Sequence, residues 1–183
     1  MVDPGLNVYI GTTGTGKTHK AIRDAIELAG QKRLGVLVID SRGAENLREI
    51  PEFRPGQELY ETVYHRGGIA RVVPKDETEF DSIMGVVDRT GRVILMIDEV
   101  AAWATSKTLQ NLCRVWRHKQ VSIFLTTQKI GRDIEQTILA CDPQLYLFRV
   151  TNPRTLEWCE RWHRVTEQRL RALRVGEYYK VTF

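Results

Sequence analysis

Short apolar runs rich in branched side chains alternate along the chain with longer segments of helical period. This alternation is typical of a mainly parallel sheet covered by helices, because strands buried on both faces are apolar at nearly every position. The runs predict strands near Leu6–Ile10, Gly35–Asp40, Ile69–Val73, Arg92–Ile97, Val121–Thr126, Gln144–Val150 and Tyr178–Phe183. The sequence therefore predicts an α/β fold with a mainly parallel central sheet and helices on both faces.

Apolar residues at helical spacing predict the helices between these strands. The first is expected over Lys17–Ala29 and to end at Gly30, a residue suited to a helix C-terminus. The second follows Thr105 and has an apolar and a basic face, and the third spans residues 130–141. The fourth begins at Asn152-Pro153, where Asn caps and Pro fills the first helical position. The stretch 41–68, with two prolines and four glycines, reads as an extended surface loop or a subunit contact.

Composition supports one compact domain. The chain has 183 residues, of which 42% are apolar and 27% charged. We expect a single domain over residues 1–183, with a core at about 6–150 and a basic helix and strand segment at 151–183. No apolar run is long enough for a membrane span or a signal peptide, so neither is expected. The three cysteines have no metal-ligand spacing, which disfavours a zinc module or a disulfide framework.

Positive charge is concentrated in two stretches, although the net charge is only +4. Arginines dominate residues 149–174, and residues 107–119 carry four basic side chains with no acid. Because the planar guanidinium suits phosphate, contact with a polyanion is a reasonable expectation. A solvated, mildly basic surface is the equally open alternative.

A glycine-rich motif follows the first predicted strand. It reads Gly11-Thr12-Thr13-Gly14-Thr15-Gly16-Lys17-Thr18 and matches the P-loop pattern of Gly, four residues, Gly, Lys and Ser or Thr. Glycines let the backbone wrap a phosphate, and the amides and the positive end of the next helix stabilise its charge. All eight residues are expected to bind ATP, with Lys17 at the β and γ phosphates and Thr18 on Mg²⁺.

Two adjacent acids end the apolar run Val93–Ile97. Asp98 and Glu99 would lie at the carboxyl end of a buried strand, where ligands bind in open α/β sheets. Asp98 is expected to hold the magnesium ion through water, and Glu99 to orient and polarise the attacking water. A base for water favours hydrolysis over transfer to another acceptor.

The strand after this one ends in Thr126-Thr127-Gln128, and Gln128 is a candidate sensor of the γ phosphate. Arg114 and Arg117 lie just upstream, in the basic stretch. Either is a candidate for an arginine that a neighbouring subunit supplies to the transition state. A solvent-facing charge or a DNA phosphate contact remains open for both.

These segments together resemble the HerA/FtsK branch of P-loop ATPases. The segments are GTTGTGKT, VILMIDEV, RVWRHKQVSIF and the Thr-Thr-Gln strand end. Within that branch, the chain looks like the genome-packaging ATPases of tailless icosahedral viruses with an internal membrane. The resemblance implies a RecA-like parallel sheet, a homohexameric ring with nucleotide at subunit boundaries, and ATP-driven movement of double-stranded DNA. It also implies capsid vertex proteins as partners and a place in the host cytoplasm or at the virion vertex.

Two departures from related proteins qualify this resemblance. The chain lacks the membrane segment of the cell-division translocases, and no DNA-reading domain follows Phe183, so only the motor core is expected. Candidate DNA contacts are Lys129, Arg132 and the arginine-rich segment beyond Arg149. A small nucleotide or metabolite kinase, and an ATP-dependent assembly switch without turnover, remain the alternative functions.

Overall fold

A computed structural model describes residues 4–181, without the side chains of residues 133, 135 and 137. In this part of the chain, seven strands form one sheet in the order β3-β2-β4-β5-β1-β6-β7. The strands are β1 (Leu6–Ile10), β2 (Val36–Asp40), β3 (Ile69–Val72), β4 (Ile94–Asp98), β5 (Ser122–Thr127), β6 (Gln144–Leu147) and β7 (Tyr179–Val181). All pairings are parallel except that of β7 with β6. The seven predicted strands are confirmed, and residues 182–183 of the last one lie outside the described residues.

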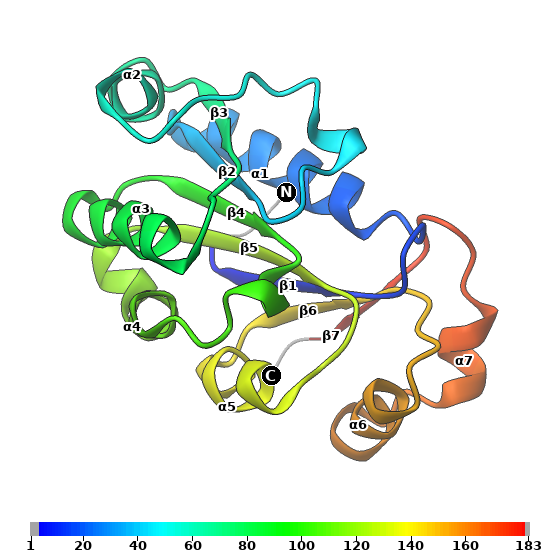
Figure 1. Cartoon of the computed structure of the whole chain (residues 1–183). Coiled ribbons are helices and arrows are strands. Elements are labelled where there is room, and N and C mark those ends of the chain that lie inside the picture. Colours follow the sequence, from blue (N-terminus) through cyan, green and yellow to red (C-terminus); the bar gives the residue numbers. More distant parts are fainter. Residues whose placement is uncertain (1–3, 182–183) are drawn as a thin grey trace.

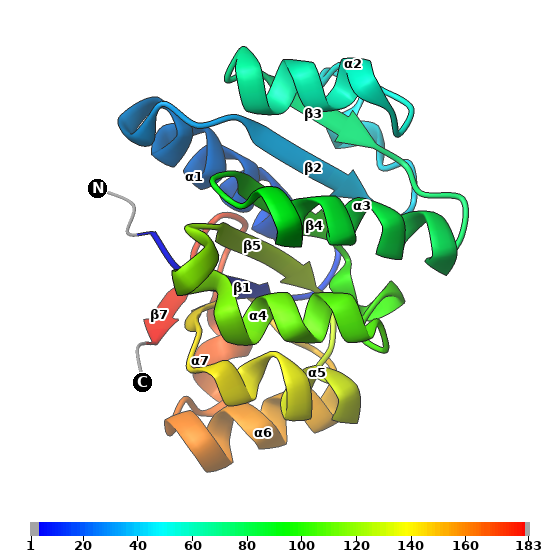
Figure 2. The same ribbon diagram turned by 90° about the vertical axis from the view of Figure 1, so that its left-hand side faces the viewer.

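Helices cover both faces of the sheet, as predicted (Figures 1 and 2). The helices are α1 (Lys17–Lys32), α2 (Gln57–Tyr60), α3 (Glu77–Thr90), α4 (Lys107–Lys119), α5 (Arg132–Thr137), α6 (Pro153–His163) and α7 (Glu167–Ala172). Helix α1 packs on one face, where its buried side chains join those of β2, β4 and β5. The buried side chains of the other helices join the larger cluster on the opposite face. Figure 2 shows α3, α4 and α5 in front of the strands.

The strand sequences explain this division. Alternate residues point to opposite faces of a sheet, so a strand that is apolar throughout feeds two cores. In β2, Val36 and Val38 belong to the cluster under α1, whereas Leu37 and Ile39 belong to the opposite one. Every residue of β1, β2, β4 and β5 is buried. Within the described residues, no helix is long and apolar enough to cross a membrane.

Three local predictions were wrong. Helix α1 continues through Gly30 to Lys32, and Arg33, at φ 55°, ends it in the left-handed conformation. The predicted helix over 130–141 is the shorter α5, followed by a 3₁₀ turn. The stretch 41–68 is not an extended loop, because a 3₁₀ turn, α2 and a π-helical turn bury Leu59 and Val63 there.

Helix α3 was not predicted, although its signals are present in the sequence. Phe80, Ile83, Met84 and Val87 follow helical spacing and are buried. Asp76 caps the helix by accepting a hydrogen bond from the Glu79 amide at 2.8 Å. The N-cap and the apolar spacing together would have identified this helix.

The strand order places the candidate motifs together. Strand β5 lies between β1, which precedes the glycine-rich loop, and β4, which ends in Asp98. Because these three strands are parallel, their carboxyl ends meet at one edge of the sheet. The segments that follow them therefore form a common site.

Candidate functional site

The glycine-rich loop joins β1 to α1, and its backbone is held from both sides. The Gly11 amide donates to the Thr127 carbonyl at 3.1 Å, and the Thr12 amide donates to the Arg149 carbonyl at 2.9 Å. The Thr15 hydroxyl closes the loop by donating to the Thr12 carbonyl at 2.8 Å. The ends of β5 and β6 thus fix the loop from two neighbouring strands.

Glycine is required in this loop for two different reasons. Gly14 and Gly16 have φ values of 77° and 92°, which side chains with a Cβ rarely adopt. At Gly11, an added Cβ would lie 2.6 Å from the Phe148 Cβ. At Gly14, by contrast, a Cβ would meet nothing within 4 Å. The loop is therefore tightly packed at its base and open at its tip, as a cradle for an anion needs to be.

Thr18, the second residue of α1, is hydrogen-bonded to Asp98 at the end of β4. The Thr18 hydroxyl donates to Asp98 Oδ1 at 2.8 Å, although 80 residues separate the two in sequence. The Thr126 hydroxyl donates to the same oxygen at 2.7 Å. Residues 94, 96 and 98 of β4 and residues 124 and 126 of β5 point toward α1 by strand alternation. This alternation explains why these three side chains converge.

Glu99 is held in a strained conformation beside Asp98. Its φ of 52° and ψ of 59° lie in the left-handed region, which is costly for a residue with a side chain. Its amide donates to the Thr126 hydroxyl at 2.9 Å, and its Oε1 accepts from the Gln128 amide at 3.3 Å. Glu99 is 5% exposed. The acid and the end of β5 are thereby fixed relative to each other.

A cavity of about 580 Å³ lies over these groups. Its lining includes most of the predicted site: Thr13, Gly14, Gly16, Lys17, Thr18, Asp98, Glu99 and Gln128. Gly11, Thr12 and Thr15 do not line the cavity. Their hydrogen bonds hold the base of the loop in place. Lys17 as a whole residue is 7% exposed. Among the described residues, none forms a hydrogen bond or an ion pair with its amino group. That ammonium is thus available to an anion in the cavity.

The oxygens of Thr18 and Asp98 fit a magnesium ion. Mg²⁺ prefers hydroxyl, carboxylate and water oxygens, and it keeps several waters when it binds with a phosphate. Among the described residues, no cluster of three or more His, Cys, Asp or Glu side chains is arranged to hold a metal by itself. The donor set therefore suits a metal that enters with a phosphorylated ligand.

Buried polar contacts anchor α1 below the loop. The Tyr9 hydroxyl donates to Asp24 Oδ2 at 2.8 Å, and Lys20 Nζ lies 2.6 Å from Asp24 Oδ1. Burial, followed by the charge of Asp24, raises the pKa of Tyr9, so its hydroxyl keeps its proton. Lys20 Nζ also lies 5.3 Å from the centre of the Tyr146 ring. This network ties the first turns of α1 to β1 and β6.

Arg42 was not predicted as a site residue, yet it lines the cavity. The turn that carries it is capped by Asp40, whose Oδ1 accepts from the Arg42 amide at 3.2 Å and the Ala44 amide at 2.9 Å. Asp40 is itself buried in an ion pair of 2.9 Å with Arg71. The Ser41 hydroxyl donates to the Asp98 carbonyl. A buried ion pair thus fixes an exposed arginine beside the acids.

Five more residues at the site were not predicted: Thr126, His19, Ala44, Asn46 and Val175. Thr126 had a signal, because it belongs to the Thr-Thr-Gln segment at the end of β5, two residues before Gln128. His19 follows the glycine-rich motif directly. Asn46 and Val175 carry no motif, and only the folded chain brings them to the cavity.

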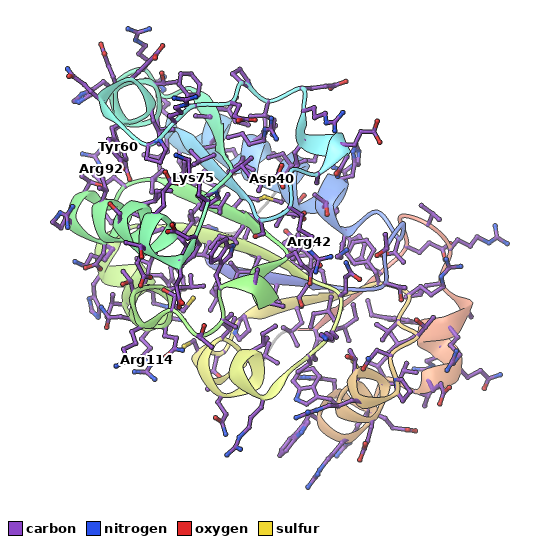
Figure 3. All side chains as sticks on the ribbon, in the orientation of Figure 1. Asp40, Arg42, Tyr60, Lys75, Arg92 and Arg114 are labelled. Carbon is purple, nitrogen blue, oxygen red and sulfur yellow. The ribbon has the colours of Figure 1, made fainter. Side chains whose placement is uncertain are left out.

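Arg114 and Arg117 are not part of this chain's own cavity. Both are exposed on α4, and the Arg117 guanidinium lies 5.1 Å from the centre of the Trp116 ring. The end of α4 leads into the start of β5, at the edge of the sheet opposite the glycine-rich loop. In the view of Figure 3, exposed Arg42 lies near the middle of the picture, and Arg114 lies well away from it on the outer side of α4.

Comparisons with known proteins place this geometry in a known fold. No protein-family model and no curated protein sequence matches the chain. Among solved structures, the genome packaging NTPase B204 of Sulfolobus turreted icosahedral virus 2, in complex with ATP-gammaS, matches with a TM-score of 0.76 at 12% identity. That match covers 97% of this chain and 92% of B204. The chain has the RecA-like P-loop NTPase fold.

Two further structures show the same likeness. The DNA-packaging ATPase B204 of Sulfolobus turreted icosahedral virus matches with a TM-score of 0.74 at 14% identity, over 100% of this chain and 94% of that one. The cytoplasmic domain of the Type VII secretion ATPase EccC of Thermomonospora curvata matches with a TM-score of 0.57 at 13% identity. It covers 98% of this chain but only 22% of EccC. At these identities the likeness concerns the fold.

Proposed function

We propose that the chain is a P-loop ATPase that hydrolyses ATP to move double-stranded DNA. The observation that supports hydrolysis best is the shared hydrogen bonding of Thr18, Asp98, Thr126 and Glu99. These contacts connect the phosphate cradle, through Thr126 of β5, to the two acids at the end of β4. One acid is thereby placed to hold a metal and the other to act on water.

Each site residue has a role in this proposal. The loop amides and Lys17 bind the phosphates, and Thr18 and Asp98 hold the magnesium ion, which draws charge from the phosphate oxygens when bound. Glu99 orients the attacking water and accepts its proton. Gln128 follows β5, the strand whose Thr126 hydroxyl accepts a hydrogen bond from the Glu99 amide. Gln128 reports whether the γ phosphate is present. The strained backbone at Glu99 keeps the carboxylate directed into the cavity.

Genome packaging is the process that we propose for this motor. The chain shares its fold over nearly its whole length with two proteins named as packaging enzymes. It also carries clusters of arginine, which suit sequence-independent contacts to DNA phosphates. We place it in the HerA/FtsK branch, as a homohexamer that works with capsid vertex proteins in the host cytoplasm or at the virion vertex. Lys129, Arg132 and the segment beyond Arg149 are the proposed DNA contacts.

Arg114 or Arg117 would act on a neighbouring subunit's nucleotide. Their exposed position on α4, outside their own chain's cavity, fits a role across a subunit boundary. Mixing Arg117→Ala chains with Lys17→Ala chains tests this idea, because a residue acting across the boundary allows some mixed sites to recover turnover. Arg114→Ala is tested in the same way, and Lys107→Ala is the exposed control on α4. Failure of both mixtures to regain activity would exclude the two arginines.

The main experiment measures ATP turnover with and without duplex DNA at low salt, where phosphate contacts are strongest. We expect DNA to stimulate turnover, and Glu99→Gln to bind ATP while abolishing hydrolysis. Turnover that ignores DNA would contradict the motor, and a phosphorylated small molecule among the products would indicate a kinase. Unchanged behaviour of Glu99→Gln would indicate a switch. The mass of the particle in ATP and magnesium then tests the ring, since six copies are expected.

A further inference from the structure

The segment between α7 and β7 makes a tight turn at residues 174–177. The Glu177 amide donates to the Arg174 carbonyl at 3.1 Å, and Glu177 Oε2 accepts from the Arg174 amide at 2.8 Å. Gly176, the third residue of the turn, has a φ of 87°, as a type II turn requires at that position. Val175 is therefore the outer corner of a rigid turn. We call residues 174–177 the C-terminal turn.

The C-terminal turn is attached to the phosphate cradle. The Gly176 amide donates to the Thr15 carbonyl at 3.0 Å. An added Cβ at Gly16 would lie 3.3 Å from the Gly176 nitrogen, so the two backbones touch. Figure 1 shows this segment passing beside the chain that leads from β1 into α1. Val175, which lies near the end of the sequence, thus becomes part of the wall of a cavity formed mainly by segments from its first part.

Tyr178 fixes the turn to the body of the protein. Its ring lies 5.4 Å from the Phe148 ring and 5.5 Å from the Tyr146 ring, centre to centre. Lys20 Nζ lies 5.2 Å from the centre of the Tyr178 ring. Strand β7 follows at once and pairs with β6. The turn is therefore held on both sides, and the position of Val175 is set by packing.

The two ends of the cavity differ in chemistry. Asp98, Glu99 and Gln128 follow β4 and β5, on one side of the P-loop strand β1, whereas the C-terminal turn precedes β7, on the other side. A terminal phosphate must lie near the acids if they are to act on it. The remainder of a nucleotide would then extend toward β6 and β7. At that end, the apolar side chain of Val175 lines the cavity and is 68% exposed.

The geometry points to the C-terminal turn as the nucleobase-binding wall of the site, with Val175 in contact with the face of the base. This inference rests on the proposed nucleotide binding and adds the part of the ligand that the P-loop motif does not contact. An exposed valine in a polar cavity gains by covering its surface with a flat aromatic ring. His19, exposed on α1 and also lining the cavity, contributes a second flat surface.

Binding of two ligands by calorimetry, with magnesium present, tests this inference. ATP carries a base, and inorganic tripolyphosphate carries only the phosphate chain. For Val175→Ser we expect ATP affinity to fall about fivefold, from the lost apolar contact, and tripolyphosphate affinity to change less than about twofold. The matched control is Ile26→Ser, which removes another exposed apolar side chain, 50% exposed, outside this cavity. It should leave both affinities unchanged.

The other outcomes separate this inference from the proposed function. Unchanged ATP binding by Val175→Ser would overturn the base-binding wall, and so would an equal loss for both ligands, which would mean that the turn only shapes the cradle. Lys17→Ala should weaken both ligands. If the unaltered protein bound neither ATP nor tripolyphosphate, the proposed function itself would fail, and the inference with it.

Discussion

Thr126 offers the sharpest test of how the two acids are held. Its hydroxyl is completely buried, donates to Asp98 Oδ1 at 2.7 Å and accepts from the Glu99 amide at 2.9 Å. Thr126→Val keeps the shape of the side chain and removes both hydrogen bonds. Its neighbour Thr127 is equally buried, but its hydroxyl donates to the Lys129 carbonyl at 2.9 Å and touches neither acid. Thr127→Val is therefore the matched control.

The expected magnitudes follow from these contacts. A hydrogen bond to a charged group contributes about 1.5–3 kcal/mol, and a buried amide left without a partner costs about 1–3 kcal/mol. Thr126→Val should thus lower the free energy of unfolding by roughly 3 kcal/mol, against about 1 kcal/mol for Thr127→Val. With the acids free to shift, ATP turnover should fall about 100-fold in Thr126→Val, because small displacements of catalytic groups are costly.

Urea unfolding and steady-state ATP turnover give the two measurements. Both are made at a temperature at which each variant is folded, so that lost activity does not reflect lost protein. Equal effects of the two substitutions on turnover would refute the positioning role of Thr126. Equal effects on stability would show that the hydrogen bonds to the acids contribute no more than an ordinary one.

Further predictions concern stability. Arg71→Met leaves Asp40 buried without a cation and should lower the free energy of unfolding by about 3–5 kcal/mol in urea, whereas Arg66→Met, at an exposed ion pair, should change it by less than about 0.5 kcal/mol; similar losses would contradict this. Gly11→Ala forces a Cβ into a packed site and should cost about 1–3 kcal/mol, so an unchanged Tm would be evidence against a tight loop base. Burial lowers the pKa of His163, so the unfolded state binds the proton more strongly and stability should fall as the pH drops below about 6.5. His163→Gln should reduce that fall, and an identical pH profile in the variant would disprove the assignment.

Patterns over neighbouring residues explain why much of the fold was predictable. The β1 strand, the glycine-rich loop and the start of α1 form one continuous segment, so their signals reinforce each other. Asp98 and Glu99 follow the apolar run Val93–Ile97, and this run predicted their position at the end of a buried strand, which is β4. The boundaries failed where local signals were ambiguous. Gly30 suggested a helix end, but α1 continues to Lys32, and Arg33 ends it in the left-handed conformation without a glycine.

The rest of the site depended on contacts between distant segments. Arg42 reaches the cavity because the buried Asp40–Arg71 pair shapes its turn, and the two partners of that pair lie 31 residues apart. Val175 reaches it because the Gly176 amide donates a hydrogen bond to the Thr15 carbonyl, although the two residues lie near opposite ends of the sequence. Neither Arg42 nor Val175 belongs to a sequence motif or spacing that would mark it as a site residue.

The sequence by itself determined the α/β layering, the glycine-rich loop between β1 and α1 and the position of two acids at a strand end, because each depends on periodicity or on residues adjacent in the chain. Only the tertiary structure decided which strand separates β1 from β4, and hence that Thr126 joins Thr18 to Asp98 and Glu99. The tertiary structure also decided that Val175, from the C-terminal turn, lines the cavity. The physical reason is that the order of the strands, and the path that brings residues 174–177 back to the glycine-rich loop, are set by the packing of the whole core, which no local pattern records.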